Sequence, residues 1–173
     1  MVRFLSQKLF RLRKRRRAVA QSCSRPTWDN YFLDIAELSA SRATCQRRKV
    51  GCVLVDSKHH IVSVGYNGVP SGFYHCIGDI PCPGASSPSG TDLDLCEAVH
   101  AEVNAFLHLT SQDELTAYLT VCPCISCTKM ICNSNVKRVV ASEWYAHPGI
   151  TEMLSKAGIA LEIIRRNTDA GKQ

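Results

Sequence analysis

Two short motifs constrain the fold of this chain most strongly. In His100-Ala101-Glu102 one residue separates a histidine from a glutamate, and in Pro123-Cys124-Ile125-Ser126-Cys127 two residues separate two cysteines. An imidazole and two thiolates are three of the four ligands in a tetrahedral zinc site, and catalytic sites keep the fourth position open for water. We therefore predict an open zinc site formed by His100, Cys124 and Cys127, which the fold must bring together.

Glu102 is the carboxylate that this ligand set does not need. Zinc lowers the pKa of a bound water, and a neighbouring carboxylate can take up and return the proton as general base and acid. Alone, a Cys-x-x-Cys pair could equally be a redox pair or half of a structural zinc site. His-x-Glu followed by Pro-Cys-x-x-Cys is the signature of the zinc-dependent nucleobase deaminases, which the chain therefore resembles.

The apolar pattern predicts one α/β domain, with a five-stranded mixed sheet flanked by helices in three α/β/α layers. The expected helices cover residues 28–43, 97–109, 124–133 and 150–157. The expected strands cover residues 50–55, 60–65, 117–121, 136–141 and 159–164. The first two strands form a hairpin, and the later strands are parallel because helices connect them.

Charge divides the chain into a basic N-terminal tail, residues 1–25, a domain, residues 26–165, and a C-terminal tail, residues 166–173. The basic tail holds nine Lys or Arg and no acid, which leaves twelve bases and fifteen acids in the rest of the chain. It could be a solvated tail, an organelle-targeting segment or a polyanion-binding segment. Ten cysteines without a secretory signal indicate reduced thiols and a cytoplasmic protein. No apolar stretch approaches the roughly 20 residues of a membrane span.

Beyond the zinc motifs, residues 26–165 resemble the deoxycytidylate deaminases. The resemblance rests on Lys49-Val50-Gly51, on Gly65-Tyr66-Asn67-Gly68-Val69-Pro70-Ser71-Gly72, on His100-Ala101-Glu102-Val103-Asn104-Ala105 and on Thr120 ahead of Pro123. It implies a cytidine deaminase-like fold and the hydrolysis of dCMP to dUMP for thymidylate synthesis, with dCTP as a further candidate substrate. It also implies a homohexamer regulated by dCTP and dTTP, with Mg²⁺ accompanying the triphosphate.

The same resemblance implies that Asn67 contacts the sugar or phosphate and that Tyr145 contacts the substrate. Arg47 and Arg48 precede the first strand and could bind a phosphate, for which Arg offers paired donors. Solvated surface charge is the alternative for both arginines. Cys122 stands where purine-deaminating relatives usually have Glu, which argues against a purine substrate.

Four further cysteines, Cys45, Cys76, Cys82 and Cys96, bracket the long loop after the second strand. Four thiolates would make a closed structural zinc site, and His75 could replace one of them. The resemblance supports Cys45 and Cys76 as ligands, because some phage and bacterial relatives have matching cysteines. Unpaired buried thiols are the alternative, since spacing alone does not establish ligation.

The sequence also allows two other functions. A polynucleotide cytidine deaminase could use the basic tail to bind phosphates, but the rest of the chain is slightly acidic and aromatic residues make up only 7% of the chain. Nucleic acid is therefore not the expected substrate. A zinc-held binding module without turnover is the other alternative, and Glu102 argues against it because such a module needs no carboxylate beside an open zinc position.

Overall fold

The structure is a computed structural model that describes residues 25–165, except residues 89, 90 and 146. Of the two predicted tails, only Arg25 falls within the described residues. The described chain contains one mixed sheet with the strand order β2-β1-β3-β4-β5. The strands are β1 (Gly51–Asp56), β2 (Ile61–Tyr66), β3 (Leu115–Val121), β4 (Val136–Glu143) and β5 (Ala160–Ile163). β1 runs antiparallel to β2 and β3, whereas β3, β4 and β5 are parallel, which confirms the predicted mixed sheet.

The β1–β2 hairpin is closed by one aspartate. Asp56 Oδ1 accepts hydrogen bonds from the backbone N–H groups of Lys58 (2.9 Å) and His60 (2.8 Å). Such a local side-chain bond stabilises a turn in place of the strand ladder. His59 takes a left-handed backbone conformation, with φ of 65°, which reverses the chain. The hairpin therefore forms where the polar residues between two apolar runs predict it.

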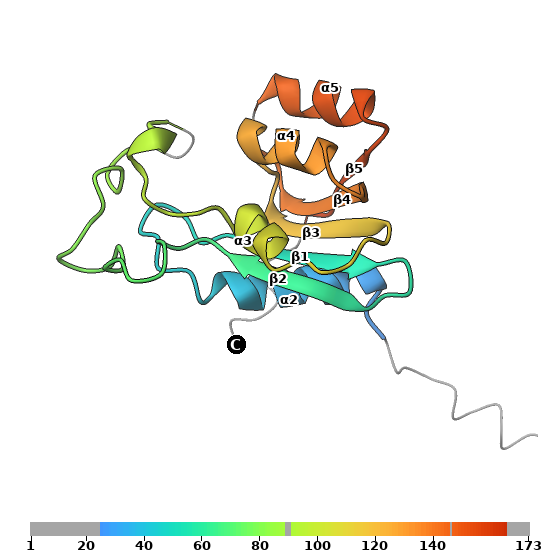
Figure 1. Cartoon of the computed structure of the whole chain (residues 1–173), viewed down its shortest axis with the longest axis horizontal. Helices are drawn as coiled ribbons and strands as arrows, with labels where there is room; N and C mark the ends of the chain where they lie inside the picture. The colour runs from blue at the N-terminus through green and yellow to red at the C-terminus, as the bar shows by residue number, and fades with distance from the viewer. Residues whose placement is uncertain (1–24, 89–90, 146, 166–173) are drawn as a thin grey trace, which may run out of the picture.

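Helices cover both faces of the sheet, as the predicted three layers require (Figure 1). Helix α2 (Trp28–Ala40) lies on one face, where Phe32, Leu33 and Ala36 pack against β1, β3 and β4. The other face carries α3 (Ala101–Leu107), α4 (Ile125–Cys132) and α5 (Pro148–Lys156). Because β3 is buried on both faces, it lies at the centre of the core.

The prediction for α3 was wrong at its N-terminus. A helix was expected from about residue 97, but α3 begins at Ala101 and His100 is its N-cap residue. Val99 is extended because it pairs with Gly68 in an isolated antiparallel bridge, with N···O distances of 2.8 and 3.2 Å. His100 consequently lies at the helix end and not in its opening turns.

A glycine brings β2 against α3. A Cβ atom at Gly65 would lie 2.2 Å from the carbonyl oxygen of Ala101 and 2.5 Å from the nitrogen of Ala105. Two side-chain bonds hold the same contact: Ser63 Oγ donates to the Ala105 carbonyl (2.6 Å), and Asn104 Nδ2 donates to the Tyr66 carbonyl (2.8 Å). The start of α3, which carries His100 and Glu102, is thereby fixed relative to the sheet.

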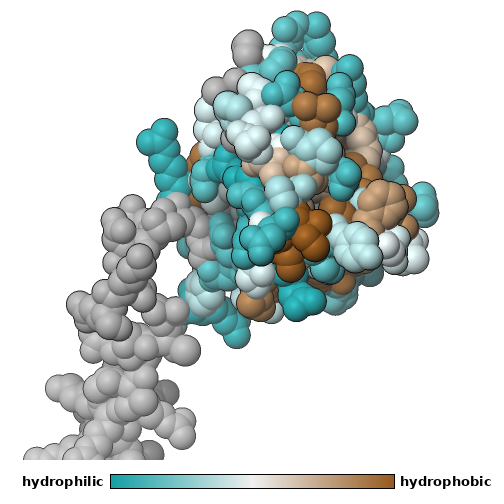
Figure 2. All heavy atoms as spheres, turned by 90° about the vertical axis from the view of Figure 1, so that its left-hand side faces the viewer, coloured by the Kyte–Doolittle hydropathy of each residue, from teal (hydrophilic) through white to brown (hydrophobic). Residues whose placement is uncertain are grey.

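The loop between β2 and α3 is long and contains one short 3-10 helix, η1 (Leu93–Leu95). It extends to the left of the sheet in Figure 1. Figure 2 shows the molecule from that side, with separated apolar patches on a largely hydrophilic surface. Phe73 and Tyr74 are exposed aromatic residues of this loop, at 57% and 83%. Among the described helices, none is long and apolar enough to cross a bilayer.

Candidate metal centre and substrate cavity

The N-termini of α3 and α4 meet at one point. His100 is the N-cap residue of α3 and Cys124 is the N-cap residue of α4, and neither side chain caps its own helix. Both side chains therefore face each other, with Cys127 from the first turn of α4 beside them. His100 Nδ1 lies 3.4 Å from Cys124 Sγ and 3.4 Å from Cys127 Sγ. The fold thus brings together the three predicted ligands from two separate segments.

The donor set fits zinc. The three ligand atoms lie within 4.8 Å of one another, and no other group of three or more His, Cys, Asp or Glu ligands in the described part of the chain does so. Zinc bonds of about 2.0 Å to nitrogen and 2.3 Å to sulfur give a tetrahedral N···S edge of about 3.5 Å. The observed separations of 3.4 Å are close to that edge, so the three atoms can bind one ion with little rearrangement.

Mutual hydrogen bonding shifts the pKa values of the three ligands. The Cys127 thiol donates to the Cys124 sulfur, which lowers the pKa of Cys124 to about 4 and raises that of Cys127. The hydrogen bond with Cys124 also raises the pKa of His100. The Cys124 thiolate lies at the N-terminus of α4, where the helix dipole favours an anion. One sulfur is therefore already in the form that a cation binds.

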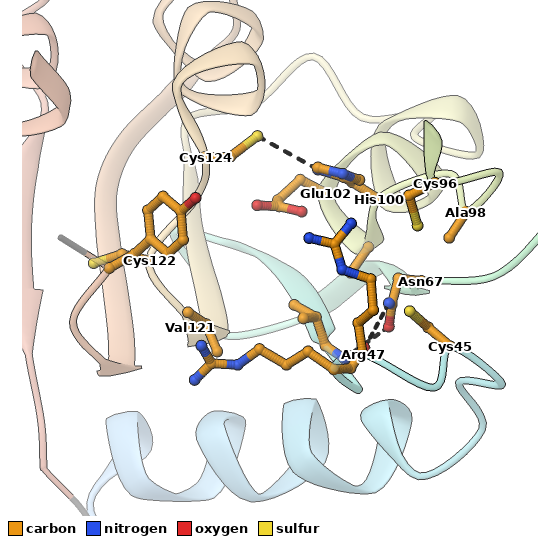
Figure 3. Close-up of a pocket in the computed structure, with 14 residues that line it drawn as sticks. Cys45, Arg47, Asn67, Cys96, Ala98, His100, Glu102, Val121, Cys122 and Cys124 are labelled. Carbon is orange, nitrogen blue, oxygen red and sulfur yellow. Dashed lines mark hydrogen bonds between the residues drawn. The ribbon is translucent and has the colours of Figure 1, made fainter. Parts of the chain in front are cut away.

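Glu102 lies in the first turn of α3 and is only 4% exposed. Burial raises the pKa of its carboxyl group above the ordinary value. Figure 3 shows Glu102 and His100 pointing toward the same cavity, with Cys124 next to His100. A carboxyl group with a raised pKa beside a metal site is suited to take up and release a proton.

A cavity of about 110 Å³ opens beside this centre. All the predicted substrate contacts line it: Arg47, Asn67 and Tyr145. Cys122 lines it as well, next to the catalytic motif. The structure therefore brings the predicted metal ligands, the predicted proton shuttle and the predicted substrate contacts to one site.

Arg47 presents an unused hydrogen-bond donor at this cavity. Its Nη2 group donates to the carbonyls of Pro88 (2.5 Å) and Thr91 (2.7 Å) in the long loop. Its Nη1 atom is buried and has no hydrogen-bond partner within the described residues. Because an unpaired buried donor is costly, this geometry favours an anionic ligand at Nη1.

Asn67 lines the cavity but uses its amide for the backbone. Its Oδ1 atom accepts from the Val50 N–H (2.7 Å), and its Nδ2 atom donates to the Arg48 carbonyl (2.8 Å). The side chain is 7% exposed. Asn67 thus fixes the segment before β1 that carries both arginines, a role that its place in a turn does not indicate.

The four remaining cysteines come from separate segments and interact in pairs, but no three of their sulfurs lie within 4.8 Å of one another. The Cys82 N–H donates to Cys76 Sγ (3.3 Å). The Cys82 side chain also forms a hydrogen bond with Cys96, and Cys96 interacts electrostatically with Cys45. Burial raises the pKa of Cys96. Burial also acts to raise the pKa of Cys82, but hydrogen bonds from the Glu97 N–H and from Cys76 outweigh this effect, so the pKa of Cys82 is lowered.

His75, the predicted substitute ligand, makes a contact of 3.3 Å with Thr44 Oγ1. Cys45 and Cys96 also line the substrate cavity, so the cysteine cluster adjoins the catalytic centre.

Arg48 and Glu143 form an ion pair that the sequence reasoning did not anticipate. Arg48 lines the cavity, and Glu143 is the last residue of β4. Arg48 was considered only as a phosphate ligand or a surface charge, and Glu143 has no motif around it. Only the pairing of β3 with β4 brings this carboxylate near the start of β1.

Converging helix N-termini, an open His/Cys/Cys group and a buried glutamate together define a zinc-dependent hydrolytic deaminase site. Residues 26–143 match the family model described as the cytidine and deoxycytidylate deaminase zinc-binding region, so the chain belongs to this family, as the motifs predict. The family and the ligand set both support zinc as the metal.

Several relatives carry the name deoxycytidylate deaminase. The Schizosaccharomyces pombe protein is 37% identical over 142 residues, which cover 79% of this chain and 44% of the relative, and the chain thus spans less than half of that protein. The Mycobacterium phage D29 protein is 41% identical over 126 residues, which cover 68% of this chain and 95% of the relative. The crystal structure of the dCMP deaminase from cyanophage S-TIM5 in complex with dCMP and dUMP is similar, with a TM-score of 0.66 and 27% identity over 81% of this chain and 98% of that one.

Proposed function

We propose that this protein hydrolyses dCMP to dUMP and ammonia. The observation that carries the proposal is that one cavity is lined by buried Glu102, by His100 and Cys124 of the metal group and by Arg47, whose buried Nη1 atom has no hydrogen-bond partner among the described residues. Two different demands of the reaction, proton transfer and phosphate recognition, are met in one cavity. The relatives named deoxycytidylate deaminase and the related structure with dCMP and dUMP support the same substrate.

Each residue has a distinct role in the proposed reaction. Zinc, when bound by His100, Cys124 and Cys127, supplies the Lewis acid that activates the attacking water. Glu102 accepts a proton from that water as it attacks C4 of the cytosine ring, and passes it to ring N3. Glu102 then takes the second proton from the hydroxyl now bonded to C4 and delivers it to the amino group, so that the C4–N bond breaks, the C4 carbonyl forms and ammonia leaves.

The substrate is held by the cavity wall. Arg47 donates from Nη1 to the 5′-phosphate, because this donor is buried and has no partner among the residues that the structure describes. Tyr145, which lines the same cavity, contacts the substrate. Asn67 contributes by holding the Arg48 carbonyl and the Val50 N–H, and thereby the chain segment that carries Arg47.

We also propose a second, structural zinc at Cys45, Cys76, Cys82 and Cys96. The pairwise contacts among them and the low exposure of Cys76 (3%), Cys82 (8%) and Cys45 (7%) support it, and binding requires the four sulfurs to move closer together than they lie in the structure. Metal analysis tests the proposal: wild type should bind two zinc ions per chain and Cys82→Ala should bind one. One zinc in both proteins would overturn it.

The assembly and regulation proposed with this function follow the family resemblance: a homohexamer, dCTP and dTTP as effectors, and Mg²⁺ with the triphosphate. Mass photometry of the full chain, with and without dCTP and Mg²⁺, tests the assembly. A monomer under every condition would contradict it.

A substrate panel tests the proposed function against its alternatives. Ammonia release is measured from cytidine, dCMP, dCTP and single-stranded DNA, with the full chain and with a chain that lacks residues 1–25. Deamination of dCMP by both chains supports the proposal. Activity on DNA that requires residues 1–25 would favour a polynucleotide deaminase, and inertness of zinc-loaded protein on all four would favour a binding module.

A further inference from the structure

We propose that Glu143 is a specificity-determining residue that favours nucleoside monophosphates over triphosphates by pairing with Arg48. This inference rests on the proposed deamination of a deoxycytidine nucleotide and concerns the number of phosphates in the substrate. Glu143 belongs to no catalytic motif and does not touch the metal ligands. Its carboxylate pairs with Arg48, which lines the cavity.

Both partners of the ion pair are held in place by their backbones. The Arg48 carbonyl accepts a hydrogen bond from Asn67 Nδ2 (2.8 Å). The Glu143 carbonyl accepts one from the Cys122 N–H (2.9 Å), and Glu143 is paired in register with Val121 of β3. The two side chains therefore meet across the end of β3, next to the residues that line the cavity.

The two arginines at the cavity differ in what is left for a ligand. Arg47 has a buried Nη1 donor with no partner among the residues the structure describes. Arg48 Nη2 is occupied by the Glu143 carboxylate. The side chains of Arg48 and Glu143 are 33% and 63% exposed, so this pair lies on the solvent side of the cavity. Arg47 therefore offers a buried donor with no carboxylate on it, whereas a phosphate at Arg48 would have to approach or displace the Glu143 carboxylate.

A longer phosphate chain would meet unfavourable charge at the same place. The β- and γ-phosphates of a triphosphate extend toward solvent, where Arg48 is already neutralised and the Glu143 carboxylate repels them. Glu37 of α2 adds to this acidic surface: burial raises its pKa, as does the nearby charge of Glu143. The repulsion acts on the outer phosphates of a triphosphate, which a monophosphate lacks. It therefore weakens triphosphate binding more than it changes the affinity for the monophosphate.

The test compares kcat/KM for dCMP and dCTP, at one fixed Mg²⁺ concentration, in wild type and Glu143→Gln. Removing one negative charge near the outer phosphates should raise the dCTP/dCMP ratio by about tenfold. Glu152→Gln is the matched control, because Glu152 is similarly exposed (68%) and paired with Lys156 on α5. Its ratio should stay at the wild-type value. Calorimetric titration with dUMP and dUTP should show the same change in relative affinity.

Glu143→Lys provides a second variant at this exposed position and should raise the ratio beyond that of Glu143→Gln. In the double variant Arg48→Gln/Glu143→Gln, the gain should be smaller than in Glu143→Gln, because the repulsion is removed but no free Arg48 guanidinium is left for the outer phosphates. Equal ratios in Glu143→Gln, Glu143→Lys and Glu152→Gln would overturn the inference while leaving dCMP deamination in place. A wild-type protein that deaminates neither nucleotide would instead refute the proposed function.

Discussion

Replacing Gly65 with alanine should damage catalysis from a position that touches neither metal nor substrate. The new Cβ atom would lie 2.2 Å from the Ala101 carbonyl oxygen and 2.5 Å from the Ala105 nitrogen. An ordinary Cβ contact needs at least 3.4 Å, so α3 must move by about 1 Å or more. Misplacement of a catalytic group by that distance costs about a hundredfold in rate, and overpacking costs about 1–3 kcal/mol of stability.

The assay is kcat/KM for dCMP together with zinc content and thermal unfolding of Gly65→Ala. We expect activity to fall by about a hundredfold because Glu102 and His100 move with the start of α3. Gly68→Ala is the matched control, since its Cβ would meet only Tyr66 Cε2, at 4.0 Å. If Gly65→Ala equals Gly68→Ala in activity and stability, the close approach of β2 and α3 does not position the catalytic residues.

Three further variants test other parts of the structure. Asp29→Asn should lose about 1 kcal/mol at pH 7, because the hydrogen bond from Arg138 lowers the pKa of Asp29 below its ordinary value of 3.8. That difference from wild type should be complete above about pH 4 and should vanish as the pH falls through the lowered pKa, as urea unfolding at several pH values would show. Asn104→Ala should raise KM for dCMP, since it removes the hydrogen bond to the carbonyl of Tyr66, the residue before Asn67 in the cavity wall. An unchanged KM would show that this hydrogen bond does not position the cavity wall. Cys124→Ala should lose the catalytic zinc by metal analysis, and retention of all bound zinc would contradict its role as a ligand.

Local signals predicted most of the secondary structure. The Asp56 turn and the two apolar runs around it predict the hairpin, and the alternating helices and strands after residue 100 predict a parallel sheet. The start of α3 was mispredicted because the bridge partner of Val99 is Gly68, about thirty residues earlier. A pattern within one window of sequence contains no information about such a partner.

The candidate site likewise contains residues that local motifs predict and features that depend on distant contacts. The residue types required by the chemistry predicted His100, Glu102, Cys124 and Cys127 as one group, and the structure brings the three metal ligands together. Three features depend on contacts between distant segments: the backbone role of Asn67, the orientation of Arg47 by the long loop, and the ion pair of Arg48 with Glu143. Each of these contacts joins segments that are far apart in the sequence, so no local pattern predicts it.

The most direct test of the account is the rate of dUMP formation from dCMP by the zinc-loaded full chain and by Glu102→Gln, with zinc measured in both. We expect wild type to release equal amounts of dUMP and ammonia. Glu102→Gln should keep the catalytic zinc and lose at least about a hundredfold in kcat, because the proton shuttle is gone. A Glu102→Gln protein with wild-type turnover, or a zinc-loaded wild type inert toward dCMP, would contradict the account.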